Sequence, residues 1–244
     1  MPRLALIENL TSGPIPPGST LMVEFDPASQ WYNASVTLAA GWLRTGGRVI
    51  YSALAQPPDD IRSQFRRLGL KPEALEKEEK LTIEDWYTTT LGQKSKEKHS
   101  IQSLKVSDLS LSLAQTELRG TSYWGSSNVG PDLLFISDDD GTVARFNDEK
   151  TWVELRLTRV NPGIRSLNAI NFFSIMRGVQ SEWAYKRLEG ASDGIIDFRL
   201  EEPGEKVGGE AKSMMRIRFM KSLAFDRRWH QLKTDGNLEV SLDE

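Results

Sequence analysis

The chain has 244 residues, of which 39% are hydrophobic and 27% are charged, and its formal net charge is -3 at pH 7. A chain of this size and composition can bury a sizeable core, and its weak acidity argues against a protein that coats nucleic acid or an anionic membrane with its whole surface. It has no cysteine and only two histidines, His99 and His230, which excludes disulfides, thiol catalysis and cysteine-bound zinc and makes a metalloenzyme a poor fit.

The N-terminal residues lack a basic region followed by an apolar run, and no stretch of about 18 apolar residues occurs. We find no internal repeat and no clear domain boundary. We therefore expect a single domain over residues 1–244, a cytoplasmic location and no contact with a membrane.

Short apolar runs alternate with amphipathic segments, which is typical of βαβ units around a mostly parallel sheet and predicts the α/β class. Gly46 and Gly47 are expected to end the first helix, and Gly69 the second. The predicted elements are, in order, a strand over 20–25, a turn over 26–30, a helix over 33–44, a strand over 48–54 and a helix with Ile61, Phe65 and Leu68 on one face.

The segment over residues 71–98 is rich in charge, and we expect its KEEK and KSKEK runs to be solvated loops around a strand at 81–86. The run DLLFIS at 132–137 is nearly all apolar, as expected for a central strand covered on both faces. Further elements are predicted as a helix around 108–118, a helix from about 147, a strand at 170–175, a helix at 182–188 and strands at 194–200 and 214–219.

The first strand, turn and helix have the layout of a P-loop, in which backbone N–H groups, a lysine and a Ser or Thr hold phosphate and magnesium. Here the sequence resembles the archaeal KaiC-like branch of the RecA superfamily, whose first strand and loop read close to GSTLLISGDPGTGKTTLA. The residues GSTLMV at 18–23 and the pair Asp26-Pro27 match this pattern. The resemblance implies a three-layer α/β/α fold with a mostly parallel central sheet and antiparallel strands at the C-terminus.

The rest of the loop, over residues 25–33, departs from the family pattern. Trp31 stands in place of the lysine and Tyr32 in place of the hydroxyl ligand, so that charge is lost and a ring is placed where phosphate would lie. Packing over an empty phosphate site is the preferred interpretation, and a reused ligand pocket is the alternative. The positions of the degenerate loop are Phe25, Asp26, Pro27, Ala28, Ser29, Gln30, Trp31 and Tyr32.

Three other places in the resemblance also lack the family's chemistry. Ala55 and Gln56 stand where the family has a pair of glutamates that activate water. Ser137 stands at the position of the Walker B aspartate, with Asp138 one residue later, and Phe219 stands in place of a lysine that reaches a neighbouring subunit's nucleotide. The scaffold pattern persists at 188–198 and 225–230, so the resemblance extends from about residue 18 to residue 240.

The stretch over residues 212–233 holds seven Lys or Arg and one acidic residue, with Phe225 and Trp229 between them. This composition suits nucleic acid or an acidic partner, although the arginines of a strand can equally form its solvated face. The residues of this basic interaction surface are Arg216, Arg218, Lys221, Arg227 and Arg228.

The predicted function is that of a noncatalytic, KaiC-like pseudo-ATPase that acts as a regulatory or protein-interaction module, through self-association or a protein partner. No catalytic residue, metal site or cofactor is assigned. ATP with magnesium is not expected to bind, and Asp138, Asp139 and Asp140 are expected to cap a turn. Two alternatives stay open: a weak ATP-binding protein or ATPase that uses Asp26, Asp138 or Lys221, and a DNA-associated recombinase paralogue.

Overall fold

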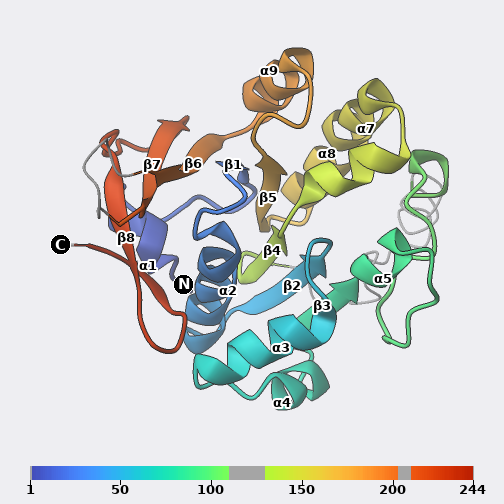
Figure 1. Ribbon diagram of the computed structural model, residues 1–244, viewed down its shortest axis with the longest axis horizontal. Helices are drawn as coiled ribbons and strands as arrows, with labels where there is room; N and C mark the ends of the chain where they lie inside the picture. Colours follow the sequence, from blue (N-terminus) through green and yellow to red (C-terminus); the bar gives the residue numbers. More distant parts are fainter. Residues whose placement is uncertain (1, 110–129, 203–209, 244) are drawn as a thin grey trace.

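The computed structural model describes residues 2–109, 130–202 and 210–243, and a sheet of nine strands runs through these segments (Figure 1). Its strand order is β3-β2-β4-β5-β1-β6-β7-β8-β9. The strands from β3 to β6 pair in parallel, whereas β7, β8 and β9 join as antiparallel neighbours. This arrangement confirms the predicted α/β class, with its mostly parallel sheet and antiparallel C-terminal strands.

The predicted strands are all present, with bounds that differ by a few residues, and β8 and β9 are additional. The strands are β1 (Thr20–Phe25), β2 (Arg48–Ala53), β3 (Leu81–Asp85), β4 (Leu133–Ser137), β5 (Ile170–Met176), β6 (Gly194–Glu201), β7 (Lys212–Met220), β8 (His230–Thr234) and β9 (Val240–Leu242).

The helices are more numerous than the sequence predicts. The predicted helix at 108–118 extends into residues outside the described ones. The described α-helices are α1 (Ala5–Glu8), α2 (Trp31–Arg44), α3 (Pro58–Arg67), α4 (Pro72–Lys77), α5 (Tyr87–Thr90), α7 (Glu149–Leu155), α8 (Asn161–Ser166) and α9 (Glu182–Ala191); η1 (Asp140–Phe146) is a 3-10 helix and η2 (Arg156–Val160) a π-helix.

Helices cover the sheet on both faces, with α2, α3 and α4 on one side and α7, α8 and α9 on the other (Figure 1). Alternate residues of β1 serve the two faces, as the pleat requires. Leu21, Val23 and Phe25 join the core beneath α2, while Met22 joins the core beneath α7 and α9. A strand buried on both faces needs a nearly continuous apolar run, which explains why β1 and β4 could be recognised from the sequence.

Glycine ends α2 and α3, as predicted. Gly46 and Gly69 have φ angles of +91° and +78°, a conformation that other residues rarely adopt. Gly47 is required for a different reason, since a Cβ there would lie 2.3 Å from the Trp42 ring.

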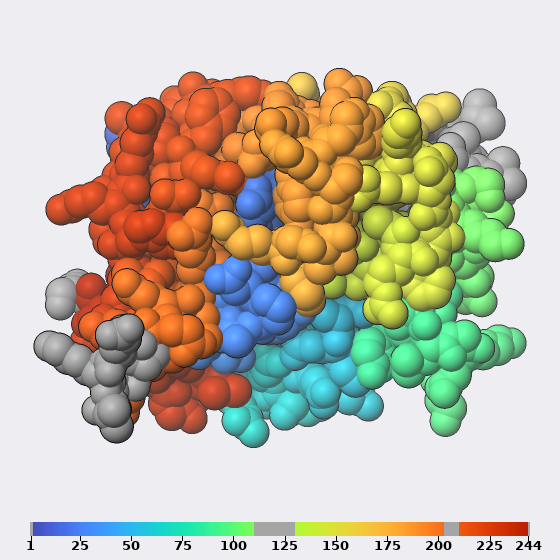
Figure 2. Space-filling view, turned by 45° about the horizontal axis from the view of Figure 1, so that its top comes forward, coloured from blue at the N-terminus to red at the C-terminus, as the bar shows by residue number. Residues whose placement is uncertain are grey.

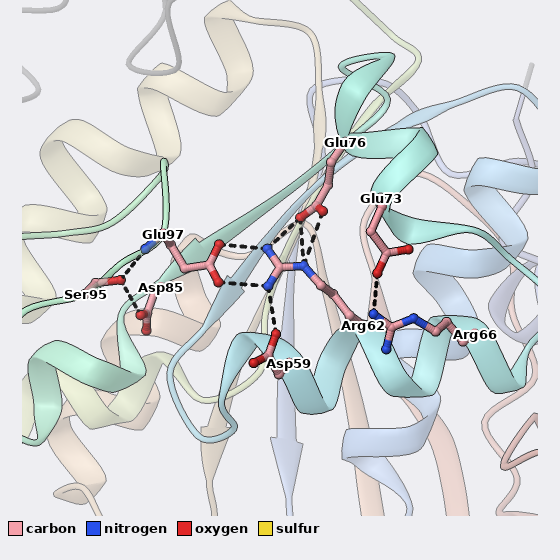
Figure 3. A network of polar contacts seen from close by, with 8 residues as sticks. All are labelled: Asp59, Arg62, Arg66, Glu73, Glu76, Asp85, Ser95 and Glu97. Carbon is pink, nitrogen blue, oxygen red and sulfur yellow. Dashed lines mark hydrogen bonds and ion pairs between the residues drawn. The ribbon is translucent and has the colours of Figure 1, made fainter.

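The charged segment after α3 does not consist only of solvated loops. It includes helix α4, and Glu76 and Glu97 both bind Arg62 of α3 (Figure 3). The Arg62 Nη1 and Nη2 atoms donate to Glu97 at 2.8 and 2.7 Å, and hydrogen bonds to Glu97 and Glu76 raise the pKa of Arg62. The prediction failed because the local density of charged residues does not show that carboxylates far apart in the chain bind one half-buried arginine, Arg62.

The outer part of the sheet departs from simple alternation at a bulge. The register between β6 and β7 shifts between Ile195 and Ile196, so that Ile196 lies opposite Ile217. Met220 is therefore buried and Phe219 is 37% exposed, whereas strict alternation along β7 would place Phe219 on the same side as Met215 and Ile217. A bulge inserts one residue and reverses the alternation beyond it.

Within the described segments, no helix has both the length and the apolar character needed to span a bilayer.

Candidate functional site

The turn over residues 26–30 joins β1 to α2 at the carboxyl end of the parallel strands, the edge where α/β proteins commonly bind ligands. Ser29 closes it, because its backbone N–H and its hydroxyl both donate to the Asp26 carbonyl, at 2.9 and 2.7 Å. The Asp26 carboxylate accepts the Leu200 N–H at 3.2 Å, and the Gln30 N–H donates to the Ser213 hydroxyl at 2.9 Å. The turn is therefore held against β6 and β7, and the N–H groups of Ser29 and Gln30 donate within the protein.

Trp31, the first residue of α2, is fully buried. Its indole Nε1 donates to the Asp138 carbonyl at 2.9 Å, and its ring centroid lies 5.3 Å from that of Phe198 and 6.3 Å from that of Phe25. Tyr32 packs against the other side of this group, 5.4 Å from Phe25 in an edge-to-face contact. These aromatic rings fill the space between the ends of β1, β4 and β6.

Asp138 follows β4 and has no exposed surface. Its Oδ1 accepts the backbone N–H groups of Leu54 and Ala55, at 2.7 and 3.0 Å, and thereby fixes the chain that leaves β2. Burial is the main cause that raises the pKa of Asp138 to about 7, against the lowering effect of these two hydrogen bonds. From the sequence, Asp138 lies one residue after the position at which the resemblance expects the Walker B aspartate. The sequence did not indicate its hydrogen bonds to Leu54 and Ala55.

The side chains of Ser137 and Asp138 lie on opposite faces of the sheet. The Ser137 hydroxyl donates to Asp140 at 3.4 Å, and Ser137 lines a cavity on the α7 side. Burial, with a smaller contribution from the Asp138 charge, raises the pKa of Tyr32 and Tyr51, whose rings belong to the α2 side. Asp139 accepts the Thr142 hydroxyl in the following turn at 2.8 Å. No group of three potential metal ligands occurs among the described residues.

The Asp138→Asn variant tests the buried acid. Because the pKa in the folded state, about 7, exceeds the ordinary 3.8, the folded protein retains a proton that the unfolded chain loses. We expect this group to lower the free energy of unfolding as pH rises from about 4 to about 7, by up to about 1.4 kcal/mol per pH unit.

The amide side chain of this variant would keep an acceptor for Leu54 and Ala55 but cannot ionise. Urea denaturation of both proteins at several pH values should therefore show a wild-type stability that falls relative to the variant over this range. A constant difference between pH 4 and 7 would mean that Asp138 titrates normally.

A group of partly and fully buried charges lies beside the turn, on the α9 side of the sheet. Asp197 of β6 is fully buried and accepts Arg216 Nε at 2.7 Å, and Arg177 and Arg218 each lie 3.5 Å from its other oxygen. Glu24 of β1 binds Arg218, and its pKa is raised by burial against the opposing effect of Arg218. Asp26 binds Arg177, and Glu189 binds Arg218. We use the name ionic cluster for these seven residues: Glu24, Asp26, Arg177, Glu189, Asp197, Arg216 and Arg218.

The five residues of the predicted basic surface lie along β7 and the segment that follows it. Arg216 and Arg218 belong to the ionic cluster, Lys221 lies 3.4 Å from Asp193, and Arg228 binds Asp226. The Arg227 guanidinium lies over the Phe225 ring, at 5.2 Å from its centroid. Much of the positive charge is therefore matched by nearby carboxylates, and binding of nucleic acid stays an untested prediction.

Three other positions named from the sequence make contacts within the protein. Ala55 supplies only its backbone N–H, and Gln56 accepts a hydrogen bond from Gln64 at 2.7 Å. His230 lies at the start of β8, 3.4 Å from Asp226.

No protein-family model and no curated protein matches this chain. Among solved structures, the chain is similar to a KaiC-like protein from the hyperthermophilic archaeon Pyrococcus horikoshii OT3, with a TM-score of 0.72 and 15% identity, over 99% of this chain and 98% of that one. At this identity the likeness concerns the fold, and it supports the KaiC-like, RecA-type architecture that the sequence resemblance implies.

Proposed function

We propose that this protein, which has a KaiC-like fold, is a pseudo-ATPase that neither binds nor hydrolyses nucleoside triphosphate. We propose that it acts as a protein-interaction module. The observation that carries the proposal is the burial of Trp31 at the start of α2, where the resemblance places the phosphate-binding lysine. A nucleotide would have to expel this ring from contacts with Phe25 and Phe198 and would find no lysine in its place. The turn's Ser29 and Gln30 N–H groups are also engaged with the protein itself.

The test is thermal denaturation with and without ATP and Mg²⁺ at millimolar concentration. A ligand that binds only the folded state must raise the melting temperature, so the proposal predicts no change. A rise of several degrees would contradict it and favour the weak ATP-binding alternative. Adenosine, which lacks phosphates, is the matched control for a nucleotide that binds elsewhere.

The interaction half of the proposal rests on the surface next to the turn. Arg177 ties the segment after β5 to β1, because its N–H donates to the Phe25 carbonyl at 2.8 Å. Val179 in that segment is 55% exposed, and Trp183 at the start of α9 is 39% exposed. Figure 2 shows surfaces from distant parts of the chain meeting on this side, where blue surface from the N-terminal part lies close to the orange region around α9. A contiguous apolar patch on the surface marks an interaction site, and we infer that Val179 and Trp183 contribute to such a patch.

We expect this edge to bind a second copy of the chain. Light scattering during size-exclusion chromatography should give a mass above 27.5 kDa for the wild type and a monomer mass for the Val179→Ser, Trp183→Ala double variant. The Leu91→Ser variant, which changes an exposed leucine elsewhere, is the control. A wild-type monomer at high concentration, or an oligomer that survives the double substitution, would exclude self-association through these residues.

A further inference from the structure

A cavity of about 120 Å³ lies on the face of the sheet opposite α2, beneath η1, α7 and η2. Its walls are largely apolar and come from Trp86, Phe135, Trp152 and Leu155, among others. An apolar cavity of about 150 Å³ holds benzene, so a volume of about 120 Å³ limits any ligand to a single ring. This cavity is separate from the β1–α2 turn, since the side chains around Trp31 belong to the core on the other face of the sheet.

Arg156 supplies unusual polar groups to this cavity. The side chain is 6% exposed, its Nη1 lies 2.8 Å from Asp140 Oδ1, and its guanidinium lies over Phe173 at 4.1 Å from the ring centroid. The Nε and Nη2 atoms are buried and have no hydrogen-bond partner among the described residues. Buried donors without acceptors are costly, so an acceptor in the cavity would remove an existing penalty.

Two further unpaired groups line the same cavity. Asn171 of β5 is 5% exposed, and its amide Nδ2 is unpaired within the described segments. The Asp140 Oδ2 atom likewise lacks a hydrogen-bond donor there. The cavity thus offers donors from Arg156 and Asn171 beside an acceptor from Asp140, and the charge of Arg156 is already matched by Asp140.

The local backbone supports a role in binding. Arg156 begins the π-helix η2, which directly follows α7 and precedes α8. Short π-helical segments are rare and frequently mark functional sites, because the wider turn changes the direction in which a side chain projects. Here the widened turn begins at Arg156, whose Nε and Nη2 atoms have no hydrogen-bond partner among the described residues and whose side chain lines the cavity.

We propose that this cavity binds a neutral, single-ring aromatic or heteroaromatic molecule that carries a carboxamide or an equivalent ring amide. The ring packs among Trp86, Trp152 and Phe135, the carbonyl oxygen accepts hydrogen bonds from Arg156 and Asn171, and the N–H donates to Asp140. A neutral ligand fits because the Arg156 charge is balanced by Asp140. The other carboxylate of the lining, Glu84, already accepts hydrogen bonds from Ser52 and Trp86. The proposal is independent of the role of the β1–α2 turn.

The experiment is isothermal titration calorimetry with benzamide as the probe, and with toluene and benzoate as comparisons. We expect benzamide to bind with a Kd of about 1 mM or below, and toluene and benzoate to bind at least about 10-fold more weakly, the fold-change that about 1.4 kcal/mol gives. The Val143→Phe variant fills the cavity from η1 while it keeps Arg156, and it should abolish binding. The Arg156→Met variant should weaken binding by at least about 10-fold, and circular dichroism checks that both variants fold.

Absence of saturable benzamide binding would overturn the proposal. Equal affinity for toluene, or unchanged affinity in either variant when folded, would also overturn it, because the polar edge or the cavity would then not be the binding site. Binding lost in Val143→Phe, with the native circular dichroism spectrum retained, would support it even if Arg156→Met failed to fold.

Discussion

Replacing Trp31 by alanine is expected to lower the free energy of unfolding by about 3–5 kcal/mol. The ring is fully buried against Phe25 and Phe198, so truncation leaves a large void that neighbouring side chains fill only in part. Urea denaturation followed by circular dichroism measures the loss. The Leu91→Ala variant, at a leucine that is 54% exposed, is the control, with an expected change within about 0.5 kcal/mol.

The Trp31→Phe variant separates packing from the indole hydrogen bond. It keeps an aromatic ring and loses the donor to the Asp138 carbonyl, which still accepts the Ser174 hydroxyl at 2.6 Å. The expected loss is therefore smaller, about 1–2 kcal/mol. If Trp31→Ala cost less than about 1 kcal/mol, the ring would not be part of the core, and its role in filling the turn region would have to be abandoned.

The second large effect is expected at Asp197 in the ionic cluster. The Asp197→Ala variant removes the carboxylate that Arg216 binds at 2.7 Å and that Arg177 and Arg218 approach at 3.5 Å. Breaking a buried ion pair leaves charge without compensation, at a cost of about 3–5 kcal/mol. The free energy of unfolding from urea denaturation is again the measurement.

The Asp226→Ala variant is the matched control, because it removes an ion pair with Arg228, a side chain that is 81% exposed. Exposed pairs contribute little to stability, and their contribution weakens further with salt. The loss at Asp197 should persist at high salt, about 0.5 M NaCl. Equal losses at Asp226 and Asp197 would show that burial does not strengthen the cluster.

The parts of the fold that the sequence predicts are those in which short-range pattern and tertiary structure agree. β1 and β4 are apolar runs because both faces of the sheet are covered, and Gly46 and Gly69 end helices because they adopt positive φ. The turn over residues 26–30 was also located correctly, since it directly follows a strand and precedes a helix.

The parts that could not be predicted depend on contacts between distant segments. The ionic cluster joins Glu24, Arg177, Asp197 and Arg218, which lie in four different parts of the chain. The sequence could therefore not distinguish arginines in ion pairs from a solvated strand face. The cavity beside Arg156 was missed as well, because its lining comes from segments that are far apart in the chain.

The candidate site has some features that the sequence predicts and others that depend on contacts between distant segments. That Trp31 and Tyr32 stand where the resemblance expects the P-loop lysine and hydroxyl could be read directly from the sequence. The burial of Trp31 and its hydrogen bond to Asp138 required the structure, because both depend on where β4 and β6 lie relative to α2.

Titration calorimetry of the purified wild-type protein with ATP and Mg²⁺ tests the central claim most directly, with a conventional P-loop ATPase measured in parallel as the positive control. If the aromatic group around Trp31 occupies the phosphate position, no saturable heat of binding should appear up to millimolar ATP, and Trp31→Phe should behave in the same way. Stoichiometric binding of ATP by the wild type would contradict this account and would show that the turn opens to admit phosphate.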